Sequence, residues 1–237
     1  MREFPFALDA RLHAAAQMIR PQSRVVDVGT DHAYLPVWLV KREICREATG
    51  VDINEKPLQK ARRTVEKYRV EDRVHLVLSD GLKGVAPDGF DDIVIAGMGG
   101  ESIADIIENA EWLKNPQKRL ILQPMTNAHR LRKYLYRNGF EIELERIVAD
   151  KKRMYTVMLV GFSGETFAEP SIAMQYAGAA AKGDGSELAQ AYLKRQARSL
   201  SEIAEGLKKA GIKPQEQKEY NKAADEILRM AEKISKQ

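Results

Sequence analysis

The fold is decided by the stretch Val25-Val26-Asp27-Val28-Gly29-Thr30-Asp31-His32-Ala33-Tyr34, in which an apolar strand runs into an Asp-x-Gly turn. A second apolar strand ends in Val51-Asp52-Ile53. A glycine at the first strand-to-helix turn lets a ligand approach the backbone, and a carboxylate at the next strand end, about 20 residues on, can bind ribose hydroxyls. The two stretches therefore predict a nucleoside-binding site at the carboxyl ends of parallel strands.

The residues that follow Gly29 discriminate between cofactors. The two further glycines that bring backbone against a pyrophosphate in dinucleotide-binding proteins are missing. Asp31 would also repel a phosphate at the helix N-terminus, where anions normally bind. A cationic sulfonium fits this turn better, so the sequence favours S-adenosylmethionine. The plainer alternative is a strand and turn that only begin an α/β sheet.

Length and composition bound the class of protein. A chain of 237 residues with 44% hydrophobic content can form one α/β domain and a smaller appendage. The single Cys45 excludes an internal disulfide and a cysteine-based zinc site, and four scattered histidines offer no metal-ligand spacing. No apolar run reaches the roughly 18 residues that span a bilayer. We expect a cytoplasmic protein without a metal, and its net charge of +4 permits a polyanionic partner.

Strand-like and helical segments alternate along the first two thirds of the chain, which predicts a parallel sheet. Helices are expected behind Asp9 as N-cap and over residues 127–138, with Asn127 as N-cap and Gly139 at the C′ position. The expected parallel strands cover residues 24–28, 48–53, 74–78, 92–96 and 120–123. Two further strands, 140–149 and 154–162, are joined by a link too short for a crossover helix, so they should pair antiparallel. This plan is the class I Rossmann-like methyltransferase fold, with seven strands and an antiparallel last pair.

The composition shifts to Gly, Ala, Ser and Glu around residues 163–186, which indicates a domain boundary. We expect a catalytic domain over residues 1–163 and a helical domain over 164–237. Apolar residues then recur in two heptad patterns that predict an antiparallel coiled coil: Leu193, Gln196, Leu200, Ile203, Leu207 and Ala210, and Tyr220, Ala223, Ile227, Met230 and Ile234. One solvated helix is the alternative.

Two more strand ends carry candidate binding residues. Ser79-Asp80-Gly81 follows the third strand, and Ala96-Gly97-Met98-Gly99-Gly100 ends the fourth. Asp80 can accept a hydrogen bond from an adenine amino group, and the glycines free the backbone to pass close to a methyl donor.

Together, the blocks at 27–36 (Asp-Val-Gly-Thr-Asp-His-Ala-Tyr-Leu-Pro), 50–54 (Gly-Val-Asp-Ile-Asn), 96–100 and 120–124 (Leu-Ile-Leu-Gln-Pro) resemble the bacterial tRNA (adenine-22-N1)-methyltransferase family. The resemblance extends through about residue 162. It implies S-adenosylmethionine-dependent methylation of N1 of a D-arm adenine in tRNA. Met125 and Thr30 depart from the pattern, where Asn and Ser are expected. The expected cofactor-binding residues are Asp27, Gly29, Thr30, His32, Asp52, Ile53, Asp80, Gly81, Ala96, Gly97 and Met98.

Methylation of adenine N1 needs orientation more than acid or base catalysis, because N1 already carries a lone pair. Asp31 is the catalytic candidate, since its carboxylate can accept a hydrogen bond from the adenine amino group and stabilise the developing positive charge. A helix N-cap is the alternative role for Asp31. His32 and Tyr34 could border or stack on the base.

The basic residues are candidates for RNA backbone contacts, although charged surface residues often bind nothing. We expect the substrate to contact Tyr34 together with Arg11, Arg132 and Arg153, and further contacts could come from Lys151, Lys152, Lys194, Arg195 and Arg198. The protein is expected to be a monomer. The alternative functions are a small-molecule methyltransferase with the same cofactor and a catalytically silent RNA-binding protein.

Overall fold

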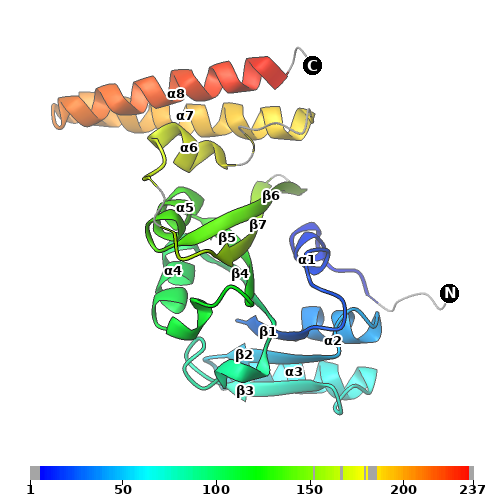
Figure 1. Cartoon of the computed structure of the whole chain (residues 1–237). Coiled ribbons are helices and arrows are strands. Elements are labelled where there is room, and N and C mark those ends of the chain that lie inside the picture. Colours follow the sequence, from blue (N-terminus) through cyan, green and yellow to red (C-terminus); the bar gives the residue numbers. More distant parts are fainter. Residues whose placement is uncertain (1–5, 152, 166–167, 179, 181–185, 235–237) are drawn as a thin grey trace.

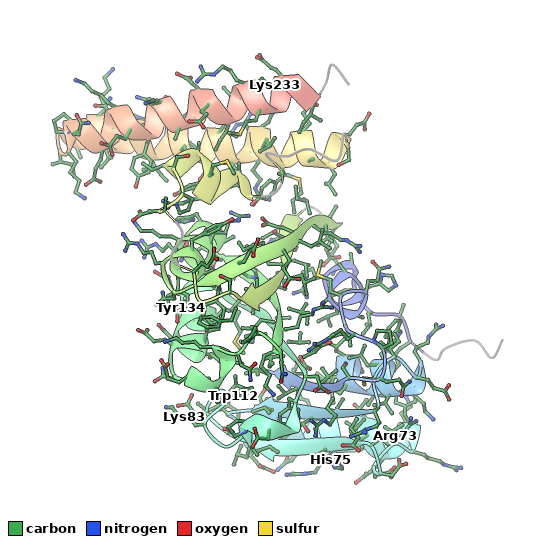
Figure 2. All side chains as sticks on the ribbon, in the orientation of Figure 1. Arg73, His75, Lys83, Trp112, Tyr134 and Lys233 are labelled. Atoms are coloured by element: carbon green, nitrogen blue, oxygen red, sulfur yellow. The ribbon has the colours of Figure 1, made fainter. Side chains whose placement is uncertain are left out.

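The computed structural model describes residues 6–151, 153–165, 168–178, 180 and 186–234, and it divides into a sheet with flanking helices and a long helical hairpin (Figure 1). Side chains fill the space between the sheet and the helices on both of its faces (Figure 2). Among the described residues, no helix combines the length and apolarity that crossing a membrane requires.

The sheet has seven strands in the order β3-β2-β1-β4-β5-β7-β6. Five strands are parallel, and β7 pairs antiparallel with both β5 and β6, which confirms the predicted fold class. The strands are β1 (Arg24–Val28), β2 (Glu47–Asp52), β3 (Val74–Leu78), β4 (Asp92–Gly99), β5 (Arg119–Thr126), β6 (Phe140–Asp150) and β7 (Arg153–Phe162). The chain order reverses between β1 and β4, and this switch point is where ligands bind in open α/β sheets.

The helices cover both faces of the sheet. One apolar core packs under α1 (Ala10–Ala16), α2 (Tyr34–Lys41) and α3 (Glu55–Tyr68), and the other packs under α4 (Gly100–Glu108) and α5 (Ala128–Arg137). Neighbouring residues of β1 alternate between the cores, because Val25 joins the first and Val26 joins the second. Two 3₁₀ turns, η1 (Pro87–Gly89) and η2 (Glu111–Leu113), complete this region.

Helix ends confirm two predictions and correct one. The Asp9 side chain accepts a hydrogen bond from the Leu12 N–H at 2.9 Å, so it caps α1 as expected. Gly139 follows α5 with φ of +75°, the left-handed conformation in which glycine is least strained. Asn127 precedes α5 but makes no side-chain cap, because its amide donates to Glu101 Oε2 at 2.8 Å instead.

Three helices follow the sheet: α6 (Ile172–Ala177), which the sequence did not predict, α7 (Glu187–Ala210) and α8 (Pro214–Ile234). The helices α7 and α8 run side by side (Figure 1), and Ala223, Ile227 and Ile234 of α8 are buried as expected. The predicted stripe on α7 is partly wrong. Leu193 and Leu200 are buried, but Ile203 is exposed and Ala210 lies at the surface, whereas Ala197 and Ala204 take core positions. The buried face is rotated because α7 packs against α6 and β6 as well as α8.

Candidate active site

A cavity of about 610 Å³ lies at the carboxyl ends of the central parallel strands. It collects residues that the sequence predicts as cofactor ligands from four separate segments: Gly29, Asp52, Ile53, Asp80, Gly81, Ala96, Gly97 and Met98. Pockets of roughly 300–1,000 Å³ hold drug-sized ligands, so this one can accommodate a nucleoside cofactor.

Glycines let the backbone turn tightly around this cavity. Gly29 has φ of +77°, and a Cβ atom at this position would collide with the Met98 side chain. Gly97 adopts φ of +81° at the end of the central strand β4. Gly50, one strand away, has no room for a side chain because a Cβ atom there would lie 2.8 Å from the Thr30 side chain. These positions explain why glycine stands in the motifs quoted above.

The lining of the cavity is acidic. Asp52 stands at the end of β2, where its Oδ1 accepts a hydrogen bond from the Asn54 N–H at 2.9 Å. Asp80 follows β3 and pairs at 2.6 Å with the ammonium of Lys83, which is labelled in Figure 2. Carboxylates at these strand ends can accept hydrogen bonds from ribose hydroxyls and amino groups, and they attract a cationic ligand.

Sequence reasoning missed several lining residues. Ser79 directly follows β3, and Ser102, Asp105 and Ile106 face the cavity from α4. Their spacing of three and four residues behind the Gly99-Gly100 turn is the signal that marks one helix face. Gly100 is needed there because a Cβ atom would meet the backbone carbonyl of Asn127 at 2.5 Å.

Asp27 and Thr30 are buried and do not line the cavity. Asp27 is buried in β1, and burial raises the pKa of its carboxyl group to about 6. The Thr30 side chain lowers this pKa in part, whereas the Asp52 carboxylate raises it further. Asp27 therefore belongs to the electrostatic environment of the site, and its role as a direct cofactor ligand stays a prediction.

Asp31, His32 and Tyr34 form a second group, on the turn between the cavity-lining Gly29 and α2, which is the rim of the site. The Asp31 carboxylate lies 3.6 Å from His32 Nε2, and its side chain is 62% exposed. The His32 ring stacks on Tyr34 with 5.2 Å between the ring centroids, and His32 does not line the cofactor cavity. The helix α2 begins at Tyr34 behind Ala33 without any side-chain cap, which contradicts the alternative role of Asp31 as an N-cap. A catalytic role for Asp31 stays a prediction.

A hydrogen-bonded network brings α1 to the same rim. Arg11 Nη1 donates to Gln123 Oε1 at 2.8 Å, and the Gly97 N–H donates to the same oxygen at 3.1 Å. Arg11 also pairs with Asp9 at 2.6 Å and lies over the Tyr155 ring. Because these protein groups bind its guanidinium, Arg11 anchors α1 to the sheet. The expected contact of Arg11 with an RNA phosphate is therefore not supported. A buried glutamine inside an apolar strand was the sequence signal for this network.

Arg132 requires a correction. Its side chain is 2% exposed and pairs with the equally buried Glu145 at 2.6 Å. It also donates to the Gln175 carbonyl at 2.5 Å and to the Tyr192 hydroxyl at 3.0 Å. Arg132 therefore joins α5 to β6, α6 and α7, and it cannot reach an RNA phosphate.

The other basic candidates lie at the surface. Lys151 is exposed in the β6–β7 turn and Arg153 is exposed at the first position of β7, whereas Lys152 lies outside the described residues. Lys194, Arg195 and Arg198 are exposed on α7. Their RNA contacts stay predictions. Within the described parts of the chain, no cluster of His, Cys, Asp or Glu residues is suited to hold a metal ion.

The family model of the methyltransferase domain matches residues 8–158, which include every strand end around the cavity. The chain belongs to this methyltransferase family. Its tRNA (adenine(22)-N(1))-methyltransferase relative from Bacillus subtilis is 34% identical over 152 residues, and this match spans 64% of each chain. These findings confirm the family recognised from the sequence motifs.

Solved structures of this methyltransferase family extend the likeness to the helical region. The Bacillus subtilis m1A22 tRNA methyltransferase TrmK has a TM-score of 0.80 at 26% identity, over 96% of this chain and 98% of that chain. Streptococcus pneumoniae Sp1610 in complex with S-adenosyl-L-methionine has a TM-score of 0.78 at 29% identity, over 92% of this chain and 98% of that chain. The structural match is therefore longer than the sequence match, and the bound ligand agrees with the cofactor predicted here.

Proposed function

We propose that this protein transfers a methyl group from S-adenosylmethionine to N1 of adenine 22 in the D-arm of tRNA. The observation that carries this proposal is the acidic cavity at the switch point of the sheet, with the exposed Asp31 carboxylate on the turn that follows its lining residue Gly29. The relative from Bacillus subtilis supports the choice of substrate. The cytoplasmic location and the monomeric state expected from the sequence are parts of the same proposal.

The residues around the cavity suit S-adenosylmethionine. Asp52 would hold the ribose hydroxyls, and Asp80 would accept a hydrogen bond from the adenine amino group. The backbone at Gly29 and Gly97 would pass close to the reacting end, because neither residue has a Cβ atom. The buried Asp27 and its neighbour Asp52 add negative potential that favours a cation. When bound, the cofactor supplies an electrophilic methyl group on a positively charged sulfur.

The chain's own residues then orient the substrate adenine. Alignment of N1 with the methyl group can contribute roughly 7–11 kcal/mol to catalysis. The Asp31 carboxylate would accept a hydrogen bond from the adenine amino group, which becomes more acidic as positive charge moves onto the purine. N1 lies on the Watson–Crick edge, so the base must leave its pair before it can react. His32 and Tyr34 offer stacked rings at the position where such a base would arrive.

The RNA itself would be held by cations outside the cofactor cavity. Arg153 at the β6–β7 turn and the basic side chains of α7 are exposed and on separate elements. The helical domain over residues 164–237 would position tRNA through the latter group.

The direct test is to incubate the protein with S-adenosylmethionine and unmodified tRNA, then digest the tRNA and locate N1-methyladenosine by mass spectrometry. We expect one modified adenine at position 22 and none when that base is replaced. In Asp31→Ala, turnover should fall by about 10²–10³-fold, as for loss of one transition-state hydrogen bond. Affinities for cofactor and tRNA should stay unchanged.

The control is Asp72→Ala, which removes an exposed carboxylate from the loop after α3 and should leave turnover unchanged. Methylation of a small molecule but not of tRNA would favour the small-molecule enzyme. Binding of both cofactor and tRNA without methyl transfer would favour the silent RNA-binding protein.

A further inference from the structure

A second cavity, of about 560 Å³, lies on the α1–α3 face of the protein. Its walls come from the segment before α1, from α1 and from the first residue of α2, together with α3. In Figure 1, α2 and α3 lie together on this side of the sheet with α1 next to them. This cavity shares no lining residue with the cofactor cavity. Apart from Tyr34, the proposed methyl transfer gives none of its lining residues a role.

Aromatic rings form a row from the rim into this cavity. His32 stacks on Tyr34, Tyr34 lies 5.2 Å from Phe6, and Phe6 lies 5.2 Å from Tyr68, measured between ring centroids. Tyr34 is 44% exposed, which is high for a large aromatic side chain. The row begins beside Asp31 and ends on α3, so it connects the proposed catalytic rim with the second cavity.

Two cations stand on the same wall of the cavity. Arg63 and Lys67 are one turn apart on α3, and both side chains are exposed. Neither is in an ion pair within the parts of the chain that the structure describes. The Lys67 ammonium lies 5.4 Å from the centre of the Tyr68 ring. The carboxylate of Asp9 also lines this cavity, but it is already paired with Arg11.

Flat rings beside unpaired cations match the chemistry of a nucleotide strand. Bases of any sequence can stack on aromatic side chains, and phosphates are attracted by arginine and lysine. A purely apolar ligand would gain nothing from Arg63 and Lys67, and a free phosphate would gain nothing from the rings. A single-stranded RNA segment would use both features.

We propose that this cavity binds nucleotides next to the target adenine, with a base against Phe6 and Tyr68 and the RNA backbone at Arg63 and Lys67. The inference rests on the proposed tRNA methylation, because it places these nucleotides beside a base held at Asp31. It assigns to α3 a role in RNA binding that is distinct from methyl transfer. The unpaired nucleotides around the extruded adenine are thereby held on the protein surface.

Charge-matched variants of α3 test the phosphate contacts. Arg63→Gln with Lys67→Gln removes the two cations of the cavity, and Arg62→Gln with Arg69→Gln removes two from positions that do not line it. We expect the first pair to raise KM for tRNA about tenfold. The slope of the logarithm of the tRNA binding constant against the logarithm of the salt concentration should become smaller in magnitude by roughly 1.4. The control pair should leave both within about twofold. The kcat at saturating tRNA and the Kd for S-adenosylmethionine should stay unchanged in all of them.

Substitutions at Tyr68 test the stacking contact. Tyr68→Leu keeps an apolar side chain but removes the ring, and it should raise the Kd for tRNA about tenfold. Tyr68→Phe keeps the ring and should bind like the unmodified protein. Equal thermal unfolding midpoints of the two variants would show that the loss comes from the ring and not from unfolding.

Several outcomes would overturn the proposal. Equal effects of the Arg63/Lys67 pair and the Arg62/Arg69 pair would mean that only overall charge matters. An unchanged Kd in Tyr68→Leu would show that the row of rings takes no base. Because Kd for tRNA is measured without turnover, these comparisons remain valid even if the protein binds tRNA without methylating it. Failure of the unmodified protein to bind tRNA would overturn both this inference and the proposed function.

Discussion

The open rim of the cofactor cavity and the closed junction under α6 and α7 both contain charged groups, but they use them in opposite ways. At the rim, Asp31 and Asp80 are well exposed, and Asp80 is paired with the exposed ammonium of Lys83. At the junction, Arg132 and Glu145 are both 2% exposed and are surrounded by further hydrogen bonds, including one from Thr156 to Glu145. Gly178 closes over them, since any side chain there would collide with the pair.

The exposed carboxylates at the rim are available to a ligand, whereas the buried ion pair at the junction stabilises the fold. Burial alone would lower the pKa of Arg132, but the Glu145 carboxylate and the Tyr192 hydroxyl outweigh burial and raise it. The cation at the junction is therefore fully compensated by protein groups. Behind the cofactor cavity the reverse holds for Asp27 of β1, whose buried carboxyl group has a raised pKa and lies near a second acid. A positively charged ligand would compensate the negative charge of the acidic groups at the cofactor site.

The largest effect is expected from breaking the junction. Arg132→Met keeps the side-chain volume but leaves Glu145 buried without its cation, which should destabilise the protein by about 3–5 kcal/mol. Urea unfolding at pH 7 would measure this loss. The control, Arg130→Met, removes an exposed arginine of α5 that pairs with Glu101 of α4 and should leave the unfolding midpoint unchanged.

A second variant sharpens this test. Arg132→Met combined with Glu145→Leu removes both charges, so it should recover most of the lost stability. If Arg132→Met alone unfolds like the unmodified protein, the junction does not hold the helical region to the sheet. An equally large loss in Arg130→Met would show that burial is not the cause.

The next effect concerns pH and the rim. Between pH 4 and pH 6 the folded protein keeps a proton on Asp27 that the unfolded chain has released, because the ordinary pKa of 3.8 is raised to about 6. The free energy of unfolding therefore falls as pH rises through this range, by about 3 kcal/mol from this group, and stays level above it. In Asp27→Asn this component should be missing.

The measurement is the difference in unfolding free energy between Asp27→Asn and the unmodified protein at several pH values. The variant should gain in stability relative to the unmodified protein as pH rises from 4 to 7. If the unfolding free energies of the variant and the unmodified protein change with pH in parallel, burial does not disfavour the charged form of Asp27.

The smallest effect is expected at Asp52, where only binding should change. Asp52→Ala removes a charged hydrogen-bond acceptor from the cavity, which should weaken S-adenosylmethionine binding by about 1.5–3 kcal/mol. Titration calorimetry would measure this, with Asp72→Ala as the control. Unchanged affinity would exclude Asp52 as the ribose ligand. The same experiment on Arg132→Met should show normal affinity if rim and junction act independently.

Much of the fold could be predicted because its signals are local. The Gly29 turn, the acids at the ends of β2 and β3 and the short link at 151–152 each specify a backbone geometry within a few residues. Parallel strands place their carboxyl ends at one edge, so the acids around the cavity follow from the strand order. The residues of α4 that face the cavity could have been found by helical spacing.

Where prediction was wrong, the cause was a partner distant in sequence. Asn127 looked like an N-cap, but Glu101 takes its side-chain amide. Ile203 fits a heptad position on α7, yet that helix turns a different face inward because α6 and β6 also pack on it. Arginine usually occupies the exposed face of a helix, so Arg132 was expected at the surface. Only the packing of α6 and α7 buries it.

The sequence by itself determined the order of the elements, the turn at Gly29 and the acidic strand ends, because these depend on backbone conformation and side-chain period. The tertiary structure alone decided which charges face a ligand and which are neutralised inside the protein. Arg11 meets Gln123 across 112 residues, and Arg132 meets Tyr192 across 60. Such long-range contacts determine the burial and the hydrogen bonding of each polar side chain, and thereby its chemical role.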